Sequence, residues 1–200
     1  MKAALCVLSY KRYDLTAQTV AHNITNCGHD DIGLFVEDTF GIAKASNNVL
    51  RRAYLDGYDF FVLLGNDILM PDGWLSDYIQ HANHLSGMIS YPINEIRTQV
   101  SYEMVVGCFG ITRRVVDAVG AFDERFDPYG AIDLDYNKRC TEKGFMNFYL
   151  PFKCAKEIDH NDGSLYGFNK PELVNKTWGL HTGETLGHIP LIELKQMSEI

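Results

Sequence analysis

Residues 60–67 read Phe-Phe-Val-Leu-Leu-Gly-Asn-Asp, and this stretch decides the fold class. Five consecutive apolar residues, Phe60 to Leu64, predict a strand that is covered on both faces, as in a parallel sheet. The Gly-Asn-Asp that follows is a turn signal placed directly after the strand. The stretch therefore predicts a buried central strand whose carboxyl end presents an amide and a carboxylate.

Strands and helices alternate on the amino-terminal side of this stretch. Apolar runs at Ala3–Leu8 and Asp31–Glu37 predict two further strands, and the spacing of apolar residues predicts helices over 14–26 and 41–55, with Asp14 as the cap of the first. Such alternation favours an α/β fold with a mostly parallel sheet flanked by helices. Ligands bind such sheets beyond the carboxyl ends of the strands, so the residues that follow the three strands are the first candidates for a site.

The pattern continues on the carboxyl-terminal side as far as residue 158. The predicted elements are helices over 74–85, 113–119 and 133–143 and strands over 88–91, 105–112, 148–150 and 154–158. From about residue 161 the chain is rich in Gly, Asn and His and its periodicity is weak. We therefore expect the regular fold to end near that point.

The composition is that of an ordinary globular chain. Its 200 residues are 46% hydrophobic and 22% charged, which suffices for one domain with a full core. The formal net charge of −8 disfavours a nucleic acid partner, because duplex binding depends on Lys and Arg neutralising phosphates. A local basic patch remains compatible with that charge.

Targeting signals and cysteines point to a reduced compartment. The opening segment Met1–Leu8 is too short for a signal peptide, and no apolar run approaches the roughly 20 residues that a membrane span needs. The five cysteines form no Cys-x-x-Cys pair and no zinc spacing, which is typical of reduced thiols used as small hydrophobic residues. We expect a cytoplasmic protein without a membrane span.

The turns after the strands lack the common phosphate-binding loops. Neither G-x-G-x-x-G nor G-x-x-x-x-G-K-[ST] follows any predicted strand. The remaining common way to hold a diphosphate is a divalent cation between carboxylate and phosphate oxygens, and Asp67 is a sensible ligand for it. An Asn-Asp pair after a strand is also an ordinary turn, so the spacing alone leaves both readings open.

Two further polar positions are candidates for chemistry. Asp133 and Asp135 precede a helical run; carboxylates there favour a helix start, and one of them is also a candidate general base for an acceptor hydroxyl. Residues two apart do not share a helix face, so only one of the pair can point at a reaction. His160 follows a strand and is either a solvated loop residue or a metal ligand.

Taken in order, these pieces resemble an inverting glycosyltransferase of the GT-A fold, in the large family-2 group, over about residues 3–166. The stretches that carry the resemblance are Leu8–Arg12, Glu37–Asp38, Gly41–Asn47, Leu63–Asp67 with Met70–Leu75, Gly107–Arg114, Val119–Phe126, Asp133–Arg139, Lys143–Phe145, Leu150–Pro151 and His160. They are similar to the family's opening turn, base-reading acidic residue, G-x-A-x-A-x-N stretch, D-x-D-type metal motif, G-x-F-D-E-x-F stretch and D-x-D-x-x-x-R stretch.

The sequence departs from the family pattern at two positions. Gly65 stands where a full D-x-D motif has its first Asp, so Asp67 and Asn66 have to suffice. Ile132 stands where a Glu usually precedes the catalytic Asp. This departure keeps Asp135 as a second candidate beside Asp133 for the base.

The resemblance implies a donor, a metal and a mechanism. The donor is a nucleoside diphosphate sugar, with a UDP-sugar expected, and the cofactor is Mn²⁺ or Mg²⁺. The implied donor-binding residues are Ser9, Tyr10, Asp38, Asn47 and Asn66. Asp67 and His160 would bind the metal, and Asp133 would deprotonate an acceptor hydroxyl that attacks with inversion. The acceptor, whether a glycan, a lipid-linked sugar or another hydroxyl compound, is not readable.

The resemblance also implies a domain plan and leaves alternatives. Residues 1–164 would form the GT-A domain, with a donor half over 1–91 and an acceptor half over 92–164, and residues 165–200 would be an extension near the active site. One alternative is a non-catalytic glycan- or nucleotide-sugar-binding module derived from a transferase. A sugar nucleotidyltransferase is disfavoured, because it needs a Gly-rich loop after the first strand.

Overall fold

The computed structural model describes residues 1–96, 107–159, 171–175, 177 and 186–192. Among these residues, a six-stranded sheet has the order β2-β1-β3-β6-β5-β7. The strands are β1 (Ala3–Leu8), β2 (Ile32–Glu37), β3 (Phe60–Gly65), β5 (Ser86–Ser90), β6 (Cys108–Thr112) and β7 (Met146–Tyr149). Strand β6 runs antiparallel to both of its neighbours, and the other pairs are parallel. The expected mostly parallel α/β sheet is confirmed.

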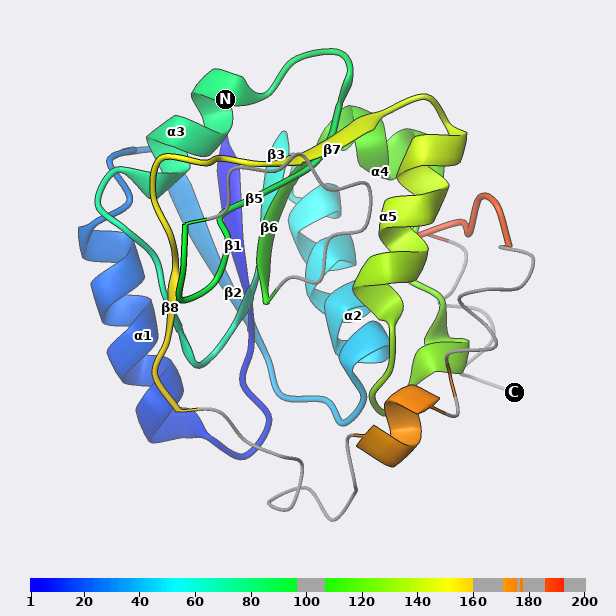
Figure 1. Cartoon of the computed structure of the whole chain (residues 1–200), viewed down its shortest axis with the longest axis horizontal. Helices are drawn as coiled ribbons and strands as arrows, with labels where there is room; N and C mark the ends of the chain where they lie inside the picture. Colours follow the sequence, from blue (N-terminus) through cyan, green and yellow to red (C-terminus); the bar gives the residue numbers. More distant parts are fainter. Residues whose placement is uncertain (97–106, 160–170, 176, 178–185, 193–200) are drawn as a thin grey trace.

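Helices cover both faces of this sheet (Figure 1). The helices are α1 (Tyr13–Thr25), α2 (Ile42–Leu55), α3 (Trp74–His81), α4 (Arg113–Val119) and α5 (Ile132–Glu142), with a short 3-10 turn η1 (Glu124–Phe126) before α5. Figure 1 places α1 and α3 on one side of the sheet and α2, α4 and α5 on the other. The chain therefore folds as a three-layer sandwich.

The alternation of side chains along the strands builds one hydrophobic core on each face. In β1, Ala4 and Cys6 join the core under α2, whereas Leu5 and Val7 join the core under α3. All residues of β3 before Gly65 are at most 4% exposed, because the strand is covered on both faces. Burial of such side chains is the main term that stabilises a sheet of this kind.

A second, two-stranded sheet lies at the edge of the candidate site. Strand β4 (Ile68–Leu69) pairs with β8 (Lys156–Glu157) in antiparallel register, with Ile68 opposite Glu157. No sequence pattern predicts β4, because two residues are too few to show a period. This pairing brings a segment near residue 157 beside the turn that follows β3.

The remaining predictions hold with small shifts. Helix α1 begins at Tyr13, so Asp14 lies in its first turn and is not its cap, and α3 ends at His81 and not at Leu85. The polypeptide after His81 turns at Asn83, whose side chain accepts a hydrogen bond from the Leu85 backbone N–H at 2.8 Å. The predicted domain boundary at 164/165 lies outside the described residues.

Candidate functional site

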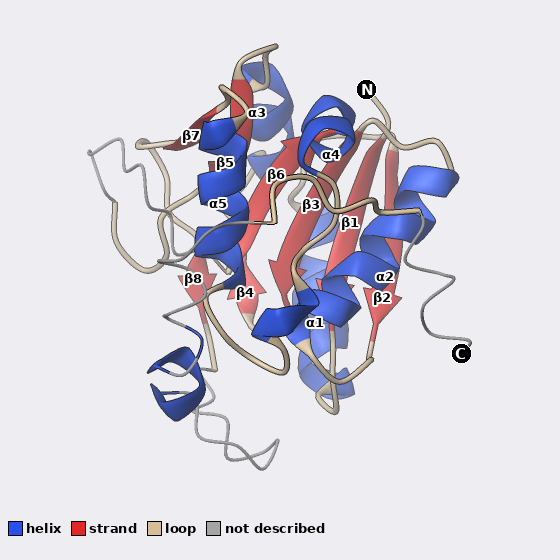
Figure 2. Ribbon diagram, turned by 90° about the vertical axis from the view of Figure 1, so that its right-hand side faces the viewer, coloured by secondary structure: helices blue, strands red, loops and turns tan. Residues whose placement is uncertain are grey.

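A pocket of about 400 Å³ opens where the carboxyl ends of β1, β2 and β3 meet. The arrowheads of these strands point to the same edge in Figure 2. Strand β6 starts there because it runs antiparallel to β3, and Gly65 N–H donates to the Gly107 carbonyl at 2.8 Å. The pocket thus lies at the edge of the sheet where the strand order predicts a ligand site.

Five of the predicted site residues line this pocket. They are Ser9, Tyr10, Asn66, Asp67 and Asp133. They come from the ends of β1 and β3 and from the start of α5, which are about 125 residues apart along the chain at the extremes. The fold therefore gathers the candidate donor, metal and base positions in one cavity.

The turn that carries Asp67 is fixed by polar side chains of α1. Asn66 Nδ2 donates to Thr16 Oγ1 at 3.2 Å, and the Asn66 carbonyl accepts from Thr19 Oγ1 at 2.9 Å. Ser9 Oγ and Thr16 Oγ1 are also hydrogen-bonded, at 2.7 Å. Because these side chains are buried and mutually satisfied, the turn is held in one geometry.

Asn23 extends the same support to β4. Its amide Nδ2 donates to the Ile68 carbonyl at 2.9 Å, and its Oδ1 accepts from Met70 N–H at 2.8 Å. Asn23 is fully buried. The polar face of α1 is thus a scaffold for the turn between β3 and β4.

The two candidate bases on α5 have different surroundings. Asp133 lines the pocket, and its Oδ1 accepts from the Leu134 N–H at 3.0 Å. Asp135 is 2% exposed and forms an ion pair with Arg139, whose Nη1 also donates to the carbonyls of Val119 and Ala121. Asp135 therefore braces the helix, whereas Asp133 faces the cavity.

Tyr129 and Glu157 line the pocket too, although no sequence pattern predicts a role for either of them. Burial raises the pKa of the Tyr129 phenol, and the carboxylates of Asp133, Asp67 and Glu157 raise it further. Asp133, Asp67 and Glu157 line the same pocket as this phenol, so the three acidic groups share one cavity. Glu157 lies three residues before His160, and this spacing in the sequence is the only signal for it.

At the end of the pocket near β2, Glu37 faces the cavity, whereas Asp38 does not line it. Glu37 lines the pocket; its Oε2 pairs with Arg52 at 3.1 Å and its Oε1 accepts from Thr39 Oγ1. Asp38 is exposed, is not among the lining residues, and accepts from Tyr13 Oη at 2.9 Å. The acidic residue that lines this end of the pocket is therefore Glu37 and not Asp38.

Two aromatic rings stand at this end. The centroids of Tyr10 and Phe40 are 5.3 Å apart, and both rings line the pocket. Phe40 is 46% exposed. An exposed ring such as that of Phe40 suits stacking against a flat ring of a ligand.

Asn47 is buried and forms hydrogen bonds with the backbone of Phe122 instead of lining the pocket. Its Oδ1 accepts from Phe122 N–H at 2.7 Å, and its Nδ2 donates to the Phe122 carbonyl and to Glu124 Oε1, each at 3.0 Å. Asn47 is not among the residues lining the pocket, but Phe122 is. Asn47 therefore fixes part of the pocket wall from behind.

The loop between η1 and α5 is tied to the start of α2. Asp127 accepts hydrogen bonds from the Ala43 N–H at 2.7 Å and the Lys44 N–H at 3.1 Å. It thus caps α2 from a distance in sequence. The cap holds Gly41 and the loop residues Pro128 to Gly130, which line the pocket, against each other.

The acidic groups of the pocket fit a hard divalent cation that is held largely by a ligand's phosphates. Mg²⁺ and similar ions take oxygen ligands and often bind one or two carboxylates, several waters and phosphate oxygens. Asp67 and Glu157 supply carboxylates from adjacent segments, and the Ile158 N–H donates to the Asp67 carbonyl at 2.9 Å. Within the described ranges, no three His, Cys, Asp or Glu side chains form a metal cluster by themselves. His160 lies outside the described residues.

Segments near the carboxyl terminus also contact the domain. Residues 171–175 and 177 are helical, and a Cβ added to Gly130 would lie 2.5 Å from Thr177 Oγ1. Ile189 exchanges backbone hydrogen bonds with Val119 and Ala121. No described helix is long and apolar enough to cross a bilayer.

Comparisons with known proteins identify the fold. No protein-family model matches the chain, and no curated protein matches it by sequence. Among solved structures, the chain is similar to the catalytic domain of Drosophila β1,4-galactosyltransferase 7 with xylobiose, at 15% identity and a TM-score of 0.65, covering 94% of this chain and 82% of the other. A mutant of that enzyme with manganese, UDP-Gal and xylobiose gives a TM-score of 0.68 at 11% identity, covering 96% and 83%.

A third structure comes from a distant organism. A mannosyltransferase from Pyrobaculum calidifontis in complex with GDP-Man and Mn²⁺ is 14% identical, with a TM-score of 0.63 over 99% of this chain and 79% of the other. At these identities the likeness establishes architecture. The chain has the GT-A fold of glycosyltransferases.

Proposed function

We propose that this protein is a metal-dependent inverting glycosyltransferase that moves one sugar from a nucleoside diphosphate sugar to an acceptor hydroxyl. The observation that carries the proposal is that Asp67 and Asp133 share one pocket at the carboxyl edge of a GT-A sheet. One carboxylate is available to a metal on the diphosphate, and the other to the attacking hydroxyl. The solved structures of this fold with Mn²⁺ and a nucleotide sugar support it by analogy.

The nucleotide would bind at the end of the pocket near β2. Tyr10 and Phe40 offer ring faces to the base, and Glu37 and Asp38 offer acceptors for its N–H groups. Ser9 and Asn66 would support the donor from the ends of β1 and β3. Asn47 would contribute indirectly, because it fixes Phe122. A uridine nucleotide is the expected donor class.

The residues that would hold the metal are Asp67, Glu157 and His160. With Mn²⁺ or Mg²⁺ held there, these residues would supply the departing diphosphate with neutralisation of its charge. The anchored turn after β3, which carries Asp67, supports this role. Glu157 joins it because β8 pairs with β4.

Asp133 would act as the general base. The acceptor oxygen attacks C1 of the sugar while the bond from C1 to the diphosphate oxygen breaks on the opposite face. The hydroxyl proton moves to the Asp133 carboxylate, and the nucleoside diphosphate leaves with the electron pair of the broken bond. Attack from the face opposite the leaving group inverts the anomeric centre. A positioned base of this kind contributes roughly 10²–10⁴ in rate.

The acceptor would approach from the side of α5, and the extension over residues 165–200 would contribute to its binding. Thr177 packs against Gly130, a lining residue of the pocket, which supports an acceptor role for the extension after residue 164. The division into a donor half over 1–91 and an acceptor half over 92–164 is part of the same proposal. The acceptor class is a glycan, a lipid-linked sugar or another hydroxyl compound.

A metal-dependent turnover assay tests the proposal. UDP-, dTDP-, GDP- and CMP-sugars are incubated with the protein and Mn²⁺, and release of nucleotide is followed with and without a mixture of sugar acceptors. Turnover that needs the metal and falls at least a hundredfold in Asp133→Asn is expected, on the scale of a lost general base, roughly 10²–10⁴. Binding of a donor with no turnover under any condition would favour the non-catalytic module instead.

A further inference from the structure

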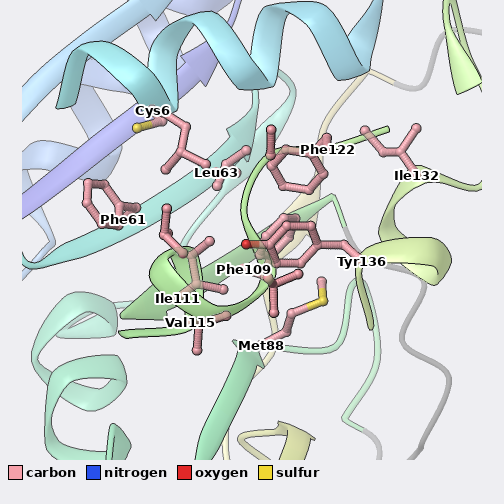
Figure 3. Packing of buried hydrophobic residues seen from close by; sticks show 14 of the residues in the cluster. Cys6, Phe61, Leu63, Met88, Phe109, Ile111, Val115, Phe122, Ile132 and Tyr136 are labelled. Atoms are coloured by element: carbon pink, nitrogen blue, oxygen red, sulfur yellow. The ribbon is translucent and has the colours of Figure 1, made fainter. Parts of the chain in front are cut away.

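The inner wall of the pocket is made of hydrocarbon side chains. Leu63 from β3, Phe109 from β6, Phe122 and Ile132 all line the cavity and are otherwise buried, at most 8% exposed. In the view of Figure 3, Phe122 lies between Leu63 and Ile132. The rings of Phe109 and Phe122 are 6.1 Å apart, edge to face. None of these four side chains carries a hydrogen-bonding group.

This wall belongs to the same pocket as the two candidate reactive carboxylates, Asp67 and Asp133. Leu63 is four residues before Asp67 on the same strand and turn, and Ile132 directly precedes Asp133. Asp67 and Asp133 line the same pocket as these four side chains. A sugar whose diphosphate is held at Asp67 and whose C1 is attacked near Asp133 would therefore lie against this wall.

The wall is also held rigidly. Asn47 makes hydrogen bonds to both backbone groups of Phe122, and Phe122 stacks on Tyr136 at 4.4 Å between centroids. Tyr136 Oη in turn donates to the Gly120 carbonyl at 3.1 Å. The polar groups behind the wall are thus engaged with one another. A sugar hydroxyl pressed against the wall would lose water and find no partner there, which costs affinity.

We propose that the donor sugar presents a methyl group to this wall, as a 6-deoxy sugar or an N-acetylated sugar does, where a common hexose presents a hydroxyl. Ile132 is the specificity-determining residue of this subsite. The inference rests on the proposed function, because it takes the donor position from it. It goes further in naming the chemical class of the sugar and the side chain that selects it.

Matched pairs of donors test the inference by calorimetric binding in the presence of Mn²⁺. The pairs are UDP-glucose with UDP-6-deoxyglucose, UDP-glucose with UDP-N-acetylglucosamine, dTDP-glucose with dTDP-6-deoxyglucose, and GDP-mannose with GDP-6-deoxymannose. In at least one pair the methyl-bearing sugar should bind about ten- to a hundredfold more tightly, the range in which apolar pockets discriminate against a hydroxyl. Comparison of the 6-deoxy and N-acetyl pairs shows whether the wall binds the methyl group at C6 or that of the acetamido group.

Variants of Ile132 show whether the wall is the cause. Ile132→Gln places an amide beside the sugar and should reduce the preference at least fivefold, whereas the similarly sized Ile132→Leu should retain it. Binding of the unsubstituted nucleoside diphosphate with Mn²⁺ should be the same in both variants, which controls for folding. If Ile132→Gln does not fold, Phe109→Tyr adds a hydroxyl to the same wall and takes its place.

The outcomes distinguish failure of the methyl subsite from failure of the proposed transferase function. If donors bind with Mn²⁺ but the methyl-bearing sugars bind no better than their hydroxylated partners, the methyl subsite is wrong and the proposed function stands. The inference also fails if the preference persists unchanged in Ile132→Gln or in Phe109→Tyr. If no nucleoside diphosphate or nucleotide sugar binds, the proposed function fails and the subsite with it.

Discussion

Arg139 Nε donates a hydrogen bond to Asp135 Oδ2 at 2.8 Å, one turn apart on α5, and the two side chains are 0% and 2% exposed. Because of this pair, the carboxylates of Asp133 and Asp135 have different environments although they are two residues apart. Asp135 is committed to a buried cation, and Asp133 faces the pocket. The pair therefore predicts opposite phenotypes for two similar substitutions.

Asp135→Asn should destabilise the protein and Asp133→Asn should inactivate it. Loss of the Asp135 charge leaves Arg139 buried without a counter-ion, which costs about 3–5 kcal/mol, or roughly 6–20 °C in melting temperature for a chain of this size. Asp133→Asn should leave the melting temperature within about 2 °C and lower transfer roughly 10²–10⁴-fold. Thermal unfolding and transfer rates measured on both variants check this. The reverse pattern would exchange the two assignments.

Asp67→Asn should remove the metal-dependent stabilisation by nucleotide. A ligand at a hundred times its dissociation constant stabilises a fold by about 2.7 kcal/mol, which corresponds here to roughly 5–11 °C. We expect that shift with UDP and Mn²⁺ in the unmodified protein and almost none in Asp67→Asn. Asp72→Asn is the matched control, because Asp72 is exposed and not among the residues lining the pocket. An equal shift in Asp67→Asn would mean that the metal is bound by residues other than Asp67.

Glu37→Gln should weaken nucleotide binding more than Asp38→Asn does. Glu37 lines the pocket and is braced by Arg52 and Thr39, whereas Asp38 is exposed and bonded to Tyr13. A carboxylate that accepts from a base N–H is worth about 1.5–3 kcal/mol as a hydrogen bond to a charged group, or roughly ten- to a hundredfold in affinity. Titration of both variants with UDP decides which residue reads the base. A larger loss of UDP affinity in Asp38→Asn would mean that Asp38, and not Glu37, binds the base.

The sheet was predictable because its strands are short apolar runs with clear ends. Burial on both faces leaves β1 and β3 with almost no polar residue, and this pattern is readable without a structure. The motifs after those strands also fixed where Ser9, Asn66 and Asp67 would meet, since parallel strands bring their carboxyl ends to one edge. Hydrophobic pattern and topology together explain most of the site.

What sequence patterns do not reveal is a buried face that is polar. The inward residues of α1 are Thr16, Thr19 and Asn23, so hydrophobic periodicity gives no hint that they hold the turn after β3. The pairing of β4 with β8, which brings Glu157 beside Asp67, depends on a contact between residues about 90 positions apart in the chain. Asp135 is buried and Asp133 lines the pocket because different faces of α5 meet the core and the cavity, and the sequence does not show which face does which.

Asp127 should make the stability of the protein fall as the pH rises from about 4. Burial raises the pKa of this carboxyl, against the lowering effect of the Ala43 and Lys44 N–H groups. The folded state therefore holds the proton more tightly than the unfolded chain, whose Asp pKa is about 3.9. The contribution of Asp127 is then fully present below that value and is lost as the pH rises through the folded pKa.

The Asp127→Asn variant isolates this contribution, because the amide does not titrate in this range. The difference in unfolding free energy, unmodified protein minus variant, should decrease from pH 3.5 towards pH 6 and become constant above the folded pKa. Urea unfolding at a series of pH values measures it. A difference that increases with pH would mean that the two backbone N–H groups outweigh burial and that the folded pKa is lowered.

Gly41→Ala should cost more stability than Gly57→Ala, although both glycines have a positive φ. Gly41 has φ +102° and an added Cβ would lie 2.7 Å from Asp127 Oδ2, whereas Gly57 has φ +79° and open space around it. The left-handed backbone alone costs an L-residue about 1–2 kcal/mol, which is our expectation for Gly57→Ala. For Gly41→Ala the clash with the cap of α2 brings the cost to about 2–5 kcal/mol. Because Gly41 lines the pocket, Gly41→Ala should also weaken UDP binding, and Gly57→Ala, at the far end of α2, should not. Urea unfolding and UDP titration of the two variants provide the comparison, and equal losses of stability would show that the contact of Gly41 with Asp127 is not tight.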